Sequence, residues 1–323
     1  PQGLNQTAVG NYWRRAAAWP PPATPTKYYL QSAGGLSLAP PGSAGGSDSF
    51  SYDPLYPVPT DGGPNLTIPA GPRYQTAVES RADVLVYTSA PLTAPLEASG
   101  PLTAHLFAAS DATDTDWTVK LVDVYPGGLP LSVTDGVLRA RHRLSMESET
   151  LLTPGLVYEF VVDLWSTSLV FGANHRIRIE VSSSNDPRFD PNPNTGHPFR
   201  ADSVTQIARN TIYHDAGRAS YLQLPVVQPG AAGCAAGAGV TGLRIERLAS
   251  GELHVSWNPV TGDPCFAEHR LFGSDDPTSW AWFVRHPLAR TTAAEVTLSG
   301  EFGFYLVVAG GTDGGNGPHW PTP

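Results

Sequence analysis

The sequence predicts an all-β protein that consists of two β-sandwiches, and three observations support this prediction. Glycine and proline are abundant, with 33 and 32 of the 323 residues. Patterns typical of amphipathic helices are almost missing. Short runs of threonine, valine, serine and aromatic residues are bounded by Pro, Gly, Asp and Asn, which are strand and turn signals. At this length two domains are expected, and each can bury a core.

Composition narrows the class of protein. The formal net charge of −9 disfavours binding to nucleic acid or to an anionic membrane surface. No apolar run approaches the ~20 residues that a membrane-spanning helix needs, so we expect no membrane span. Two cysteines and one methionine, with abundant Thr, Ser, Gly and Pro, are typical of a secreted, extracellular bacterial protein. Because the chain starts at Pro1 without Met, we expect a processed product or a fragment.

The first domain is predicted from runs in which apolar and polar residues alternate. Alternation places Lys120 outward, and it places Arg139, Arg141 and Arg143 together on one strand face, which we interpret as solvated or salt-bridged. Many short strands with turns between them indicate a sandwich, and a jelly roll is the commonest large one. The predicted strands cover residues 83–88, 102–110, 117–124, 136–143, 157–164, 176–181 and 221–227.

The boundary between the domains is predicted at residues 228–239, QPGAAGCAAGAG, whose composition is that of a flexible linker. A jelly-roll domain with an extended N-terminal segment is therefore expected over residues 1–227, and a smaller domain over residues 240–323. The N-terminal segment, up to about residue 50, has few core signals. One interpretation is an arm that lends a strand to a neighbouring chain, and another is a segment that folds back over the jelly roll.

The second domain resembles a fibronectin type III sandwich, which is immunoglobulin-like in architecture. Residues 253–259 alternate and contain Trp257, and Tyr305 lies on a late strand, so the two aromatic rings fill opposite parts of a small core. Trp280 and Trp282 fall on one strand face. They either pack at the core and the sheet edge, which we favour, or stack on a sugar, which leaves a carbohydrate partner open.

Two cysteines, Cys234 and Cys265, lie in or beside the smaller domain. We predict that they form a disulfide if the compartment is oxidising. The alternative is a pair of unrelated buried thiols.

No nucleophile elbow of the form Gly-x-Ser-x-Gly occurs in the chain. The nearest string, residues 35–39 (GLSLA), lacks the second glycine and does not lie between a strand and a helix. His175 would need a nucleophile within hydrogen-bond reach to act as a base, so we interpret it as a structural hydrogen-bonding residue. The sequence therefore predicts no catalytic residue.

Metal and cofactor sites are also not expected. His105, His142, His197 and His214 are scattered, without the spacing of a zinc site. Two acidic strings, residues 111–116 and 190–196, have some calcium-ligand types but the wrong spacing for a calcium loop. Asn and Asp beside Pro more often cap turns, so we interpret both strings as turns.

A set of strings carries a resemblance to a known family, in the family's order. These strings look like the C-terminal jelly-roll domain of the cocaine esterase and X-Pro dipeptidyl-peptidase family, which are serine hydrolases, and together they span nearly all of residues 8–227. They are residues 9–14 (VGNYWR), 52–60 (YDPLYPVPT), 81–89 (RADVLVYTS), 114–126 (DTDWTVKLVDVYP), 135–143 (DGVLRARHR), 175–185 (HRIRIEVSSSN), 192–196 (NPNTG) and 210–214 (NTIYH).

The resemblance implies a jelly roll of the galactose-binding-like class and an accessory role. In the family, the catalytic triad comes from an α/β-hydrolase domain upstream, so no triad residue can be carried over to this sequence. We therefore expect a non-catalytic region of a secreted hydrolase that supports or walls the active site of an α/β-hydrolase domain. The alternatives are an extracellular structural subunit that self-associates by strand exchange, as a filament or surface layer, and a carbohydrate-binding module.

Overall fold

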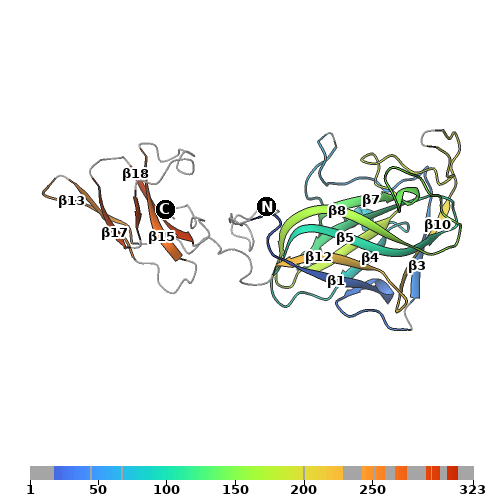
Figure 1. The fold of residues 1–323 in the computed structure, drawn as a ribbon, viewed down its shortest axis with the longest axis horizontal. Coiled ribbons are helices and arrows are strands. Elements are labelled where there is room, and N and C mark those ends of the chain that lie inside the picture. Colours follow the sequence, from blue (N-terminus) through green and yellow to red (C-terminus); the bar gives the residue numbers. More distant parts are fainter. Residues whose placement is uncertain are drawn as a thin grey trace. The chain divides into compact units, whose positions relative to one another are not determined.

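The computed structural model describes residues 18–43, 46–66, 68–198, 201–227, 242–250, 252–258, 266–274, 289–291, 293–298 and 304–311 (Figure 1). The chain divides into two compact units, the larger containing Pro22–Gln228 and the smaller Pro229–Pro323. Cys234 and Cys265 lie outside the described residues, so their disulfide stays a prediction. No helix among the described residues is long and apolar enough to cross a membrane.

The larger unit is built almost entirely of strands. Among its described residues, the α-helix α1 (Thr76–Glu79) has four residues. The strands are β1 (Thr24–Gln31), β2 (Gly35–Ser37), β3 (Gly46–Tyr52), β4 (Leu85–Ser89), β5 (Leu96–Ser110), β6 (Asp116–Val124), β7 (Pro130–Arg139), β8 (Tyr158–Phe171), β9 (Arg176–Ser182), β10 (Ala208–Asp215), β11 (Arg218–Ala219) and β12 (Tyr221–Val227).

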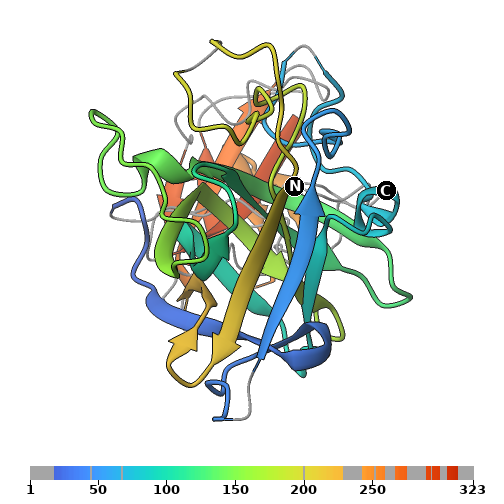
Figure 2. The same ribbon diagram turned by 90° about the vertical axis from the view of Figure 1, so that its right-hand side faces the viewer.

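These strands form two layers that face each other (Figures 1 and 2). The hydrogen-bonded order is β11-β10-β5-β12-β1-β2-β4-β9-β6-β7, with β3 beside β10 and β8 beside β5. The short hairpin of β1 and β2 joins the two layers, because β2 pairs with both β1 and β4. The core lies between them, where Trp117 of β6 packs against Phe160 of β8 and Phe50 of β3. The predicted β-sandwich is confirmed.

Strand β6 is buried on both faces. The segment between β3 and β4 contributes to the cover of its outer face, because Gln75 of that segment contacts Lys120. Lys120 points away from the core as predicted, but it is buried beneath this segment instead of facing solvent. Its Nζ donates to Oε1 of Gln75 at 3.0 Å and lies 3.8 Å from Oε2 of Glu180. A buried ammonium group requires a hydrogen-bond acceptor, and Gln75 supplies one.

The structure corrects two sequence expectations in the larger unit. The strand expected over residues 136–143 begins at Pro130 and ends at Arg139, because Ala140–His142 forms a 3-10 turn. The three arginines therefore do not share one strand face. The N-terminal segment is also not a free arm over residues 24–52: β1 pairs with β12, β3 pairs with β10, and both strands contribute to the core.

The described residues of the smaller unit form two three-stranded sheets. One has the order β13 (Arg244–Arg247), β14 (Leu253–Ser256), β17 (Glu295–Leu298), and the other has the order β16 (Ala289–Thr291), β15 (Phe266–Ser274), β18 (Phe304–Gly311). Trp257 is buried, as its predicted core role requires. The pattern agrees with an immunoglobulin-like sandwich, and the fibronectin type III assignment stays a prediction. Trp280 and Trp282 lie outside the described residues.

Candidate functional site

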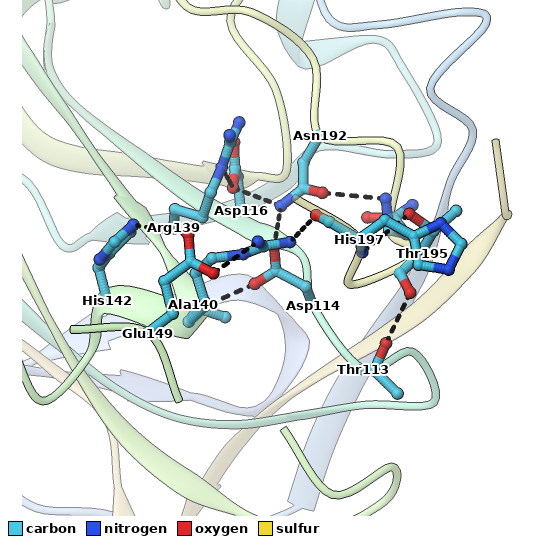
Figure 3. Close-up of polar contacts among 12 residues, drawn as sticks. Thr113, Asp114, Asp116, Arg139, Ala140, His142, Glu149, Asn192, Thr195 and His197 are labelled. Atoms are coloured by element: carbon cyan, nitrogen blue, oxygen red, sulfur yellow. Dashed lines mark hydrogen bonds and ion pairs between the residues drawn. The ribbon is translucent and has the colours of Figure 1, made fainter. Parts of the chain in front are cut away.

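A cluster of buried ion pairs forms where β6 begins and β7 ends (Figure 3). Asp116, the first residue of β6, lies directly across from Arg139, the last residue of β7. Arg139 donates from Nε and from one terminal nitrogen to the two carboxylate oxygens of Asp116, at 2.9 and 3.0 Å. Such a two-point guanidinium–carboxylate contact fixes orientation as well as distance.

The 3-10 turn after β7 brings Arg141 onto Asp114, just before β6. The Arg141 Nε donates to Asp114 Oδ2 at 2.8 Å, and the Arg141 backbone N–H donates to Asp114 Oδ1 at 2.9 Å. The remaining guanidinium nitrogens reach two loops. One donates to Oε2 of Glu149 at 3.1 Å, and the other donates to the backbone carbonyl of His197 at 2.9 Å.

Asn192 connects the two aspartates. Its Nδ2 donates to Asp114 Oδ2 and to Asp116 Oδ1, each at 2.8 Å, while its Oδ1 accepts the backbone N–H of Asn194 at 2.9 Å. The latter bond is an Asx turn, so the interpretation of residues 190–196 as a turn holds. Thr113 extends the contact by donating to the carbonyl of Thr195 at 3.1 Å.

The buried charges of the cluster stabilise the structure by pairing with one another. Asp114, Asp116 and Arg141 are all buried. Burial raises the pKa of the Asp116 carboxyl, and its bonds from Arg139 and Asn192 oppose that rise. A general acid or base must reach a proton on a substrate. These carboxylates instead accept bonds from neighbouring side chains of the same unit, so the cluster holds loops in place.

The histidines singled out in the sequence are dispersed among separate partners. His175 Nδ1 lies 2.8 Å from Asp123 Oδ1, as expected for a structural hydrogen bond. The others contact Glu159 (His105, 2.9 Å), the carbonyl of Ser145 (His142, 3.2 Å), Asp48 (His214, 3.0 Å) and Asp202 (His197). In the part of the chain that the structure describes, no group of three or more His, Cys, Asp or Glu side chains is arranged to hold a metal ion.

The structure brings together three strings that the sequence left apart. Residues 111–116, residues 190–196 and the arginines after Asp135 each had a separate interpretation, yet Asn192 and Arg141 both donate hydrogen bonds to Asp114. The pairing of Asp116 with Arg139 was not readable either, because the register of β6 and β7 shifts by one residue between Leu121 and Val122.

Comparisons with known proteins agree with this architecture. The family described as the X-Pro dipeptidyl-peptidase C-terminal non-catalytic domain matches residues 2–223. Cocaine esterase from Rhodococcus sp. is 38% identical over 229 residues, which are 67% of this chain and 40% of that protein. The chain thus spans about two fifths of the length of this relative.

Two solved structures match the same part of the chain. An α-amino acid ester hydrolase has 33% sequence identity and a TM-score of 0.62, with 67% of this chain and 39% of that chain covered. An aminopeptidase from a marine sediment Thaumarchaeota archaeon has 28% identity and a TM-score of 0.62, with 68% and 39% covered. In both, the similar region is the smaller part of a longer hydrolase.

Proposed function

The chain belongs to the family of the X-Pro dipeptidyl-peptidase C-terminal non-catalytic domain, and we propose that its larger unit walls and supports the active site of a serine hydrolase catalytic domain. The matched relatives are an esterase, an ester hydrolase and an aminopeptidase, each much longer than the matched region. All three of these proteins are named for the hydrolysis of an ester or an amide, in which an acyl group is transferred to water.

The observation that carries the proposal is the way Arg141 ties two loops to the sandwich. Its side chain contacts Glu149 in the loop between β7 and β8, and His197 in the loop between β9 and β10. Long loops that bear on an active site have to be held within a fraction of an ångström by buried neighbours. A buried ion-pair cluster beneath two loops supplies such a support.

The alternatives have less support. Assembly by strand exchange relied on a free N-terminal arm, and residues 24–52 instead contribute strands to the sandwich. The carbohydrate-binding alternative placed a sugar on the jelly roll or on the smaller domain, where Trp280 and Trp282 lie outside the described residues.

A chimera tests the proposal. The region of the Rhodococcus cocaine esterase that aligns with this chain is replaced by all 323 residues of the chain, and ester hydrolysis is compared with that of the catalytic region alone. We expect the chimera to be active and to survive heating that inactivates the catalytic region. A chimera that is no more active and no more heat-resistant than the catalytic region alone would contradict the proposal. A chimera that carries the buried change Trp117→Asp, which disrupts the sandwich core, is the matched negative control.

A further inference from the structure

Trp165 on β8 is a large aromatic residue that is exposed and has a strained backbone conformation. Its side chain is 64% exposed, and its φ of 65° lies in the left-handed region, which is strained for a residue other than glycine. The strand bulges here. Asp163 pairs with Thr103 and Ser166 pairs with Pro101, so Leu164 and Trp165 together face a single residue of β5. Bulges of this kind re-aim a side chain.

The bulge is held by a contact from strand β7 and by a contact within β8. Thr134 Oγ1 donates to the carbonyl of Leu164 at 2.8 Å, and the Trp165 N–H donates to Asp163 Oδ1 at 2.8 Å. Gly136 permits the approach, because a Cβ there would lie 1.9 Å from the carbonyl oxygen of Asp163. Strained residues that several neighbouring contacts hold in place are typical of functional positions.

Trp165 borders a groove of about 620 Å³. The groove is lined by residues of β5, β7 and β8 and by residues of the segment between β3 and α1. The apolar part of its lining consists of Pro64, Pro72, Pro101, Val133 and Trp165. The rest of the lining consists of Gly63, Gly71, Thr134, Asp163 and Ser166, so polar groups lie beside the apolar ones. Elsewhere in the segment between β3 and β4, the side chains of Leu66 and Tyr74 are also exposed.

We propose that this Trp165 groove is the docking site for an apolar segment of the catalytic domain. The inference rests on the proposed function and names the surface through which the larger unit would contact the catalytic domain. The larger part of each matched relative lies outside the region similar to this chain, so a large partner of this kind exists in those proteins. Tryptophan is among the residue types that most often carry the binding energy of a protein interface, and exposed apolar patches in clefts often mark such interfaces.

The test compares variants of the chimera described above. Trp165→Ala is expected to make the ester-hydrolase activity decay at least tenfold faster on heating, and Trp165→Phe to retain most of the resistance. The matched control is Leu144→Ala, whose side chain is 74% exposed on a loop away from the groove and which is expected to leave the decay rate unchanged. The same three variants of the isolated 323-residue chain are expected to melt together with the unchanged chain, because Trp165 makes no contribution to the core.

The outcomes separate the two proposals. Equal decay rates for the Trp165→Ala and Leu144→Ala chimeras overturn the docking site and leave the supporting role intact. A chimera that is no more heat-resistant than the catalytic region alone overturns both. Dimers of the isolated chain that Trp165→Ala dissociates, seen by sedimentation, would assign the groove to a second copy of this chain and overturn the docking site.

Discussion

Arg141 binds Asp114 through both its side chain and its own backbone N–H, at 2.8 and 2.9 Å. One carboxylate thus fixes the position of the 3-10 turn and the direction in which the guanidinium leaves it. The two remaining guanidinium nitrogens then have only the loops of Glu149 and His197 to contact. This pair therefore contributes to the position of both loops.

Replacing Arg141 by methionine is expected to lower the free energy of unfolding by about 3–5 kcal/mol, because it leaves the buried Asp114 carboxylate without its cation. Urea denaturation of the 323-residue chain measures the change. The double variant Asp114→Asn with Arg141→Met is expected to recover part of the loss, because it removes the unpaired charge. Arg218→Met, which breaks an exposed pair with Asp215, serves as the control and is expected to change little. An Arg141→Met chain as stable as the unchanged one would contradict the structural role of the cluster.

Gly136→Ala is expected to destabilise the larger unit by at least ~1–3 kcal/mol, because the new methyl group meets the backbone of β8 and cannot be avoided by rotating a side chain. Gly42→Ala is the matched control, since no atom lies within 4 Å of its Cβ position. Thermal melting by circular dichroism compares the two. Equal melting temperatures would show that β7 and β8 do not approach as closely as described.

Glu180 is expected to make stability depend on pH. Burial raises the pKa of its carboxyl to about 8, although Lys120 opposes the rise. The folded state therefore holds a proton that the unfolded state releases near 4.5, so the stabilising contribution is complete below pH 4.5 and is lost as the pH rises toward about 8. In the Glu180→Gln variant, the side chain has nearly the shape of the protonated carboxyl group and stays neutral at every pH.

Relative to the unchanged chain, the Glu180→Gln variant should gain stability between pH 5 and pH 9, on the order of a few kcal/mol. Denaturant titrations of both chains at the two pH values measure this gain. The exposed Glu147→Gln provides the control and should show no such gain. A stability difference between the Glu180→Gln variant and the unchanged chain that stays constant from pH 5 to pH 9 would argue against a protonated Glu180.

Much of the fold could be predicted from the sequence, because strand alternation is a local signal. The runs around Trp117, Phe160 and Ile177 each became strands with these side chains in the core. The N-terminal strands were missed, since β1 has few apolar residues and acquires its core position only by pairing with β12.

The site could be predicted far less well, because it depends on contacts between distant segments. Arg141 looked like part of a strand face, and only the end of β7 at Arg139 turns it onto Asp114. Asn192 is 78 residues from Asp114, and no local pattern connects them. The exposure of Trp165 is set by a bulge whose cause lies on another strand, at Thr134 and Gly136.

The central claim is that this chain belongs to the non-catalytic part of a hydrolase, and its most direct test is the turnover of p-nitrophenyl acetate by the isolated 323-residue chain. The absence of a nucleophile elbow and the pairing of the buried carboxylates with cations predict a rate equal to that of buffer with an inert protein. Turnover that a serine-directed fluorophosphonate abolishes, with the labelled serine mapped to this chain, would contradict the claim.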